Sequence, residues 1–263
     1  MMRVGLQGIG LYAPGLPSWQ EAVPVLRGDQ AWHPEPPPPV ALPLPSAERR
    51  RTSASARAAW TAAAQALADA KADARAVSTV FASSGGDGAI LHQLCLALAA
   101  PDRAVSPTQF HNSVHNAPAG YYGIATGSHS PSNSLCCHRA PFAAGLLEAA
   151  VQVGTENRRV LLVGFDLAAP FPLAPLWPAR QDFAVALLLA PPGQGEELAQ
   201  WRIGTGEQAP ASHADREDWI GELVEANPVA QCLPLLAALA AGTSARHCLP
   251  YLDGLSLEVE DAA

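Results

Sequence analysis

Residues 131–150, PSNSLCCHRAPFAAGLLEAA, decide the fold. A short run ends in two cysteines and a histidine, and Pro141 then falls in the first turn of an Ala- and Leu-rich helix, predicted over about 140–153. The first backbone N–H groups of a helix favour negative charge, so a strand-to-helix turn of this kind is typical of a cysteine nucleophile for acyl transfer. Residues 143–145, Ala-Ala-Gly, predict that this helix packs closely at the centre of the fold.

Strands and helices alternate along the rest of the chain, which predicts an α/β fold with a layered sheet. Apolar runs predict strands over 3–9, 77–83, 160–165, 183–190 and 252–259. Helical spacing predicts helices over 18–27, 53–70, 89–99, parts of 110–126, and 228–242. Ser18 is the expected N-cap of the first helix, and Trp60, Ala63, Ala64 and Leu67 are the expected buried face of the second. The proline-rich residues 34–45 predict an extended surface connector, with an SH3-type ligand as the alternative.

Composition excludes several classes of function. The chain of 263 residues has a net charge of −8, which argues against binding to nucleic acid or to an anionic membrane, and no apolar stretch reaches membrane-spanning length. Charged residues make up only 15% of the chain, so we expect a partner to cover part of its surface. Five cysteines without a signal peptide indicate reduced thiols in the cytoplasm.

Several segments in a fixed order resemble the β-ketoacyl synthases, the condensing enzymes of fatty acid and polyketide assembly. They are the opening strand and glycine turn (3–15), the helix ending in Leu-x-Gly (19–28), Glu48–Arg51, Ala119-Gly120 and the strand 160–164. The resemblance implies a thiolase-like half, a mixed sheet layered with helices, with a truncated second half. Residues 1–200 would form the N-terminal synthase-like half, and residues 201–263 a remnant segment that packs on the same domain.

The register of this resemblance puts Arg139 at the position of the family's nucleophile. Arginine stays protonated at any working pH and cannot act as a nucleophile. His213 and His247 also lack the Asn/Gly-rich turns that hold the family's two catalytic histidines. The resemblance therefore implies a non-catalytic, chain-length-factor-like subunit of the kind found in aryl polyene and other pigment pathways, with no cofactor or metal. It would form a heterodimer with a full-length β-ketoacyl-ACP synthase and meet the acyl carrier protein only through that partner.

The same resemblance places the subunit interface at residues 107–126, a segment with no charged residue from Pro107 to Tyr122. Gln109 and Phe110 would lie nearest the growing acyl chain. The other expected tunnel or interface residues are His111, Ser113, Val114 and His115. His111 and His115 also have the i, i+4 spacing of a helical metal site, but no third ligand accompanies them.

The alternative function is an acyltransferase or ketosynthase that uses Cys137 as nucleophile, with His138 or His115 as base. Against it, neighbouring residues on a strand point to opposite faces, and free cysteines are usually small buried hydrophobes. We therefore expect Cys136 and Cys137 to lie at a buried strand end, and Cys95, Cys232 and Cys248 to be packing residues. Because a cation is unfavourable at a helix N-terminus, we also expect an acceptor for Arg139, either Asp166, a backbone carbonyl or the partner.

Overall fold

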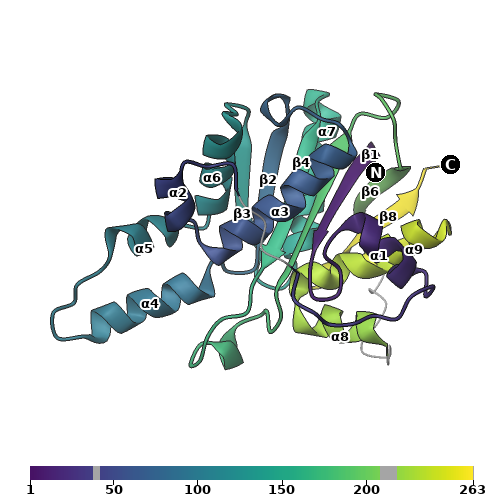
Figure 1. Cartoon of the computed structure of the whole chain (residues 1–263). Coiled ribbons are helices and arrows are strands. Elements are labelled where there is room, and N and C mark those ends of the chain that lie inside the picture. The colour runs from purple at the N-terminus through teal and green to yellow at the C-terminus, as the bar shows by residue number, and fades with distance from the viewer. Residues whose placement is uncertain (38–41, 208–217, 263) are drawn as a thin grey trace.

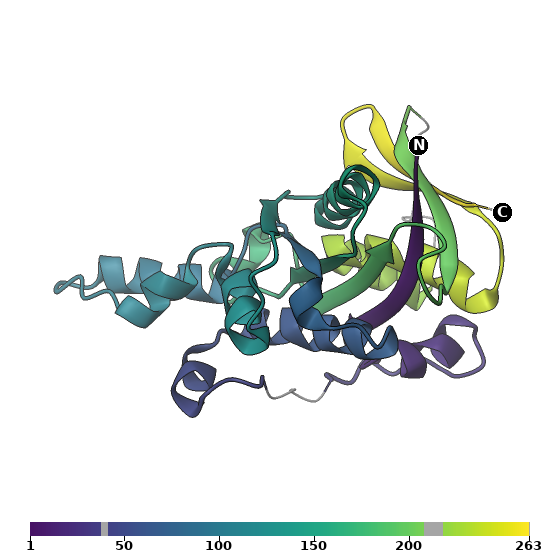
Figure 2. The same cartoon turned by 90° about the horizontal axis from the view of Figure 1, so that it is seen from above.

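The chain folds around a twisted central sheet with helices on both faces (Figures 1 and 2). The computed structural model describes residues 1–37, 42–207 and 218–262. The strands are β1 (Met2–Tyr12), β2 (Ser78–Ser83), β3 (Ser132–Cys136), β4 (Val160–Asp166), β5 (Phe183–Ala190), β6 (Ala199–Gly206), β7 (Arg246–Leu252) and β8 (Leu255–Asp261). The helices are α1 (Trp19–Leu26), α2 (Ser46–Arg51), α3 (Ala54–Asp69), α4 (Gly88–Ala99), α5 (Pro107–Asn112), α6 (Ala117–Thr126), α7 (Pro141–Glu156), α8 (Trp219–Ala226) and α9 (Leu233–Ala241). Short 3₁₀ helices are η1 (Ala74–Ala76), η2 (Ala174–Leu176) and η4 (Pro228–Cys232).

Within the described residues the sheet has eight strands in the order β3-β2-β4-β5-β1-β6-β8-β7. β3, β2 and β4 are parallel to one another, and every pair from β4 to β7 is antiparallel. The predicted mixed α/β sheet is therefore confirmed. β2, β4 and β5 are buried along their whole length, as expected for central strands that helices cover on both faces.

Helix α7 covers one face of the sheet, and its contact depends on a glycine. A Cβ atom added at Gly145 would lie 2.6 Å from Cδ1 of Leu162 and 2.9 Å from Cβ of Ala82. Ala143 and Ala144 are also buried. The predicted close approach of this helix to the centre of the fold is confirmed.

Helix α3 covers the opposite face, where Figure 2 shows it across the sheet from α7. Its buried residues include Ala59, Ala62, Ala63 and Ala66. A Cβ at Gly10 of β1 would lie 1.9 Å from the backbone oxygen of Ala62, so the helix and strand touch through their backbones. The predicted face was partly wrong: Ala63 and Leu67 are buried, whereas Trp60 and Ala64 lie at its edge. The small alanines, rather than the large tryptophan, allow this close approach.

The C-terminal part of the chain continues the sheet and caps its α7 face. β6 pairs with β1, and β8 then pairs with β6 and β7. The predicted helix over 228–242 is η4 followed by α9, while β6, β7 and α8 were not predicted. His213, Pro38 and Pro39 lie outside the described residues. No helix in the described part of the chain is both long and apolar enough to cross a membrane.

Candidate functional site

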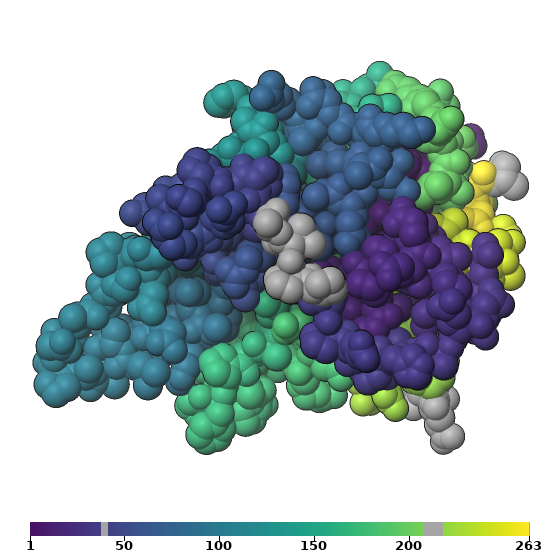
Figure 3. Space-filling view, viewed as in Figure 1, coloured from purple at the N-terminus to yellow at the C-terminus, as the bar shows by residue number. Residues whose placement is uncertain are grey.

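Helices α4 and α5 form an arm, residues 88–112, that projects from the end of the sheet where β3 lies (Figures 1 and 3). α4 begins at the N-cap Asp87, whose Oδ1 accepts a hydrogen bond from the Ile90 N–H at 3.0 Å. Its sequence, GAILHQLCLALA, has no charged residue and is apolar apart from His92 and Gln93. Of these twelve residues, all of them described, only Gly88 is buried. A helix with so few polar residues is normally buried, whereas α4 is largely exposed in the unpaired chain.

The exposed apolar side chains of the arm are large. Leu91, Leu96 and Leu98 of α4 are 44%, 52% and 57% exposed, and Phe110 of α5 is 67% exposed. The sequence analysis predicted α4 as a helix but did not assign it to an interface. The low polarity of this segment could have indicated an interface.

The residues predicted for the tunnel and interface lie on and just after α5. Gln109 is half-buried, while the side chains of the other five are exposed (Phe110, His111, Ser113, Val114 and His115). The structure thus brings these residues together on one segment beside α4. Whether they line an acyl tunnel or contact a partner subunit stays a prediction, because both roles are defined by contact with another molecule.

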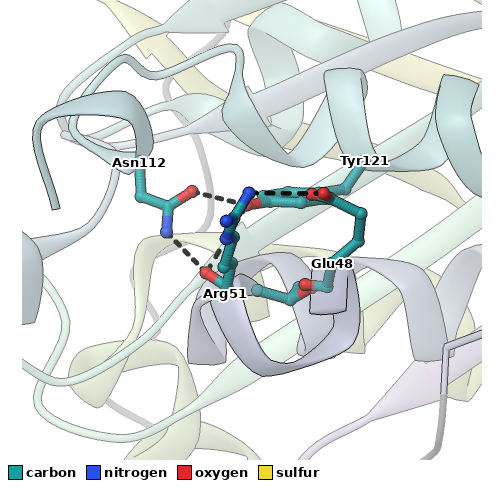
Figure 4. A network of polar contacts seen from close by, with 5 residues as sticks. Glu48, Arg51, Asn112 and Tyr121 are labelled. Carbon is teal, nitrogen blue, oxygen red and sulfur yellow. Dashed lines mark hydrogen bonds and ion pairs between the residues drawn. The ribbon is translucent and has the colours of Figure 1, made fainter. Parts of the chain in front are cut away.

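A polar network fixes the end of α5 to the body of the protein (Figure 4). The buried Asn112 donates from Nδ2 to the Arg51 carbonyl at 2.6 Å, and its Oδ1 accepts from the Tyr121 hydroxyl at 3.0 Å. Glu48 and Arg51 form an ion pair of 3.4 Å within α2. Residues of α2, α5 and α6 therefore meet at one point, and this holds the segment that carries Phe110 in a defined place.

His111 and His115 do not form a helical pair. His111 lies in α5, where its ring packs edge-on against Tyr121 with centroids 6.3 Å apart. His115 lies beyond the end of α5, and its Nε2 is 3.2 Å from the Ser134 carbonyl oxygen. The i, i+4 spacing therefore does not produce the geometry of a metal site on a helix, because α5 ends between the two residues.

The turn between β3 and α7 is held by its backbone to the end of β2. The Cys137 and His138 N–H groups donate to the carbonyls of Ser83 and Ser84 at 2.9 and 3.1 Å. His138 has a left-handed backbone with φ of 47°. Arg139 and Ala140 follow, and α7 begins at Pro141 as predicted.

The expected burial of the cysteines was wrong at three positions. Cys136 is exposed and Cys137 only half-buried, because β3 is the edge strand of the sheet and α7 covers little of its end. Cys95 is exposed on α4 rather than packed. Cys232 is buried as expected, and Cys248 is half-buried.

The electrostatics of the turn oppose a cysteine nucleophile. Although Cys136 is exposed, partial desolvation of its thiol by the surrounding residues raises its pKa, and the nearby Asp166 carboxylate raises it further. Burial and the neighbouring Cys136 also raise the pKa of Cys137. A reactive cysteine needs the opposite shift, since the thiolate is the nucleophile. No hydrogen bond joins Cys137 to a histidine within the described residues; His115 instead contacts Ser134.

Asp166 is not the partner of Arg139, so that expectation was wrong. Asp166 is fully buried and accepts from the Ser84 N–H at 2.9 Å and the Ser84 hydroxyl at 2.6 Å. Asn227 donates to the Asp166 carbonyl at 3.0 Å. Arg139 points elsewhere: its side chain is exposed, and no described residue accepts a hydrogen bond from its guanidinium. The carboxylate therefore ties the ends of β2 and β4 together instead of neutralising the turn.

Comparison with known proteins identifies what this fold resembles. The family model for the N-terminal domain of β-ketoacyl synthases matches residues 19–249. No curated protein sequence gives a significant match. A structure of the ketosynthase ApeO in complex with its chain length factor ApeC from Xenorhabdus doucetiae matches with 22% identity and a TM-score of 0.74, over 99% of this chain and 100% of the matched chain.

Two further complexes match over nearly the full length of both chains. The ishigamide ketosynthase/chain length factor has 13% identity and a TM-score of 0.70, covering 99% of each chain. The AntDE:AntF complex of a type II acyl-carrier protein with its ketosynthase has 10% identity and a TM-score of 0.77, covering 100% of this chain and 99% of the matched one. At these identities the matches show a shared fold, which is the thiolase-like half predicted from the sequence.

Proposed function

Because this chain belongs to the β-ketoacyl synthase family, we propose that it is a non-catalytic, chain-length-factor-like subunit. It pairs with a full-length β-ketoacyl-ACP synthase and shapes the acyl tunnel of that partner. The match to a chain of a complex between a ketosynthase and its chain length factor supports this proposal, since this chain and the matched chain align end to end. Contact with the acyl carrier protein is made through the partner, as the net charge of −8 disfavours direct docking of an acidic protein.

The observation that most strongly supports pairing is the uncovered arm. Leu91, Leu96, Leu98 and Phe110 expose large apolar side chains, and their contact with water costs free energy. Large exposed apolar side chains gathered on one arm are typical of a surface that a partner covers. Ile124 of α6 is also exposed, at 57%.

The edge strand β3 supports the assignment of the interface to the same side of the protein as the arm. Among the described residues β3 pairs with β2 alone, so it is an edge strand, and an edge strand is a template for another chain. His115 already occupies part of this edge, since its Nε2 lies 3.2 Å from the Ser134 carbonyl oxygen. A groove of about 280 Å³ runs beside it, and its lining is uncharged (Thr79, Asn116, Ala119, Gly120, Tyr122, Gly123, Ser128, Ser130, Ser132 and Ser134). A neutral, small-residue groove beside an open strand edge allows close approach of a partner.

The turn before α7 supports the absence of catalysis. Arg139 stands at the nucleophile position and cannot attack a thioester. The pKa values of Cys136 and Cys137 are raised, which is the opposite of the shift that activates a nucleophilic thiol. The acyltransferase alternative, with Cys137 as nucleophile, gains no support from this geometry.

We also propose that residues 1–200 form the synthase-like half and that residues 201–263 belong to the same domain. The family match crosses residue 200 without interruption, and β6 joins β1 on one side and β8 on the other. One continuous sheet therefore spans the boundary.

The chemistry is tested by cysteine variants in the co-expressed pair. Cys136→Ala and Cys137→Ala should each leave product formation unchanged, because no bond is made to either sulfur. Loss of product in Cys137→Ala, with the pair still assembled, would establish the acyltransferase function instead.

The tunnel role is tested at Phe110. Phe110→Ala removes bulk near the growing chain and should lengthen or broaden the product distribution without abolishing it. Phe171→Ala is the matched control, since Phe171 is 80% exposed but lies outside the arm, on the loop after β4. An unchanged product distribution in Phe110→Ala, or the same change in both variants, would contradict the tunnel role.

A further inference from the structure

A pocket of about 610 Å³ opens between the turn before α7 and the loop that follows β4. Its lining includes His138 and Arg139 from the turn, Leu176, Trp177 and Arg180 from the loop, and Gln231 from η4. The size is that of a site for a small organic molecule. The pairing function proposed above makes no use of this pocket.

The pocket brings together two arginines and one carboxylate. The Arg139 guanidinium has no acceptor among the described residues. Arg180 is held by its backbone N–H, which donates to the Ala226 carbonyl at 2.7 Å, and by Nη2, which donates to the Glu225 carbonyl at 3.2 Å. The Glu225 carboxylate is 3.9 Å from Nη2 of Arg180, an exposed and weak ion pair. Two guanidiniums and one carboxylate leave a single net positive charge.

The place of Arg139 at the pocket is fixed by its backbone. Gln231 donates from Nε2 to the Arg139 carbonyl at 3.2 Å, which ties the turn to η4. The His138 N–H bond to the Ser84 carbonyl holds the preceding residue. The guanidinium therefore extends from an anchored turn, so the backbone of Arg139 does not have to be ordered when an anion binds.

The remaining wall of the pocket is mixed, with the polar side chains of His138 and Gln231 beside apolar ones. Leu176 is 85% exposed, and Trp177 is oriented by a hydrogen bond of 3.1 Å from its Nε1 to the Leu167 carbonyl. The other apolar lining residues are Val224 and four prolines (Pro175, Pro178, Pro228 and Pro250). An anion that also has an apolar body would use both features, whereas an inorganic anion would use only the charge.

We infer that this pocket binds an organic monocarboxylate with an apolar body, its carboxylate held by Arg139 and Arg180. The single net positive charge matches a monoanion, and planar guanidinium groups match carboxylate geometry. The inference is independent of the proposed pairing, because the pocket is formed by residues of this chain alone.

The test is titration of the purified protein, alone or with its partner, with octanoate, its neutral analogue octanamide, and inorganic phosphate, followed by calorimetry or NMR. Octanoate should bind saturably, and octanamide and phosphate at least tenfold more weakly. Arg139→Gln and Arg180→Gln should each weaken octanoate about tenfold or more, the usual effect of losing a charge-assisted hydrogen bond. Arg75→Gln, which changes an arginine outside the pocket, should have no effect. Glu225→Gln should tighten binding, because it removes the opposing charge.

Three results would overturn the inference. They are the absence of saturable octanoate binding, equal binding of octanamide or phosphate, and unchanged affinity in both arginine variants. Melting temperatures of the variants check that each remains folded, which is expected because both arginines are exposed.

Discussion

Replacing the exposed leucines of α4 with glutamine should break the pair while leaving the chain itself folded. The variant is Leu91→Gln/Leu96→Gln/Leu98→Gln, and these residues are 44%, 52% and 57% exposed in the unpaired chain. Because they contact little within the chain, their loss removes few intramolecular contacts. What is lost is the apolar surface that a partner would cover.

The size of the effect follows from the exposed area. The three side chains together expose about one and a half leucines, and full burial of one leucine stabilises by about 1.5–3 kcal/mol. Complete coverage in the pair would therefore contribute on the order of 2–5 kcal/mol. This corresponds to a dissociation constant raised roughly 30- to 4,000-fold in the variant.

The assay is dilution of the co-purified pair followed by mass photometry, which gives the dissociation constant directly. The control is Leu198→Gln/Leu252→Gln/Leu255→Gln, three leucines with 47%, 60% and 38% exposure near the opposite end of the sheet. The control should dissociate like the unmodified pair. Equal weakening by both triple variants, or no weakening by the α4 variant, would refute the assignment of the arm to the interface.

Two further predictions concern the body of the protein. Gly145→Ala should destabilise the fold by about 1–3 kcal/mol, because the added Cβ clashes with Leu162. Gly154→Ala in the same helix is the control and should be neutral or stabilising, since its Cβ would meet only Met2 at 3.9 Å. Urea unfolding curves of the two variants measure the difference in stability, and equal stability would contradict the close packing at Gly145. Burial raises the pKa of Asp166 from 3.8 to about 7, so the folded state holds this proton more tightly than the unfolded state does. The contribution of Asp166 to the free energy of unfolding therefore falls as the pH rises from about 4 to 7. Asp166→Asn should remove that part of the pH dependence, and parallel curves for the two proteins between pH 4 and 7 would contradict it.

Those parts of the fold that depend on local chemistry could be predicted from the sequence. Pro141 marked the start of α7, and Ser18 marked the start of α1, where its side chain accepts from the Glu21 N–H. The uncharged segment around Phe110 indicated an exposed interface, and Phe110 is indeed exposed. Each of these signals lies within a few residues of the feature that it predicts.

The features that were missed depend on contacts between distant segments. Cys136 was expected to be buried, but the order of strands makes β3 an edge, and strand order cannot be read from β3 alone. Asp166 accepts a hydrogen bond from Ser84, in the loop after β2, and does not pair with Arg139. The position of that loop beside Asp166 could not be predicted from the residues around Asp166. Likewise, α4 was predicted as a helix, while its isolation from the core depends on the position of the whole arm.

The central claim is that this chain is one half of a pair with an intact ketosynthase. The most direct measurement is size-exclusion chromatography with light scattering on the two proteins co-expressed, and on this chain alone. We predict a stable one-to-one complex from the pair, and aggregation or self-association of the chain alone, because its apolar arm is then uncovered. A well-behaved monomer that does not bind the ketosynthase would contradict both the pairing and the chain-length role derived from it.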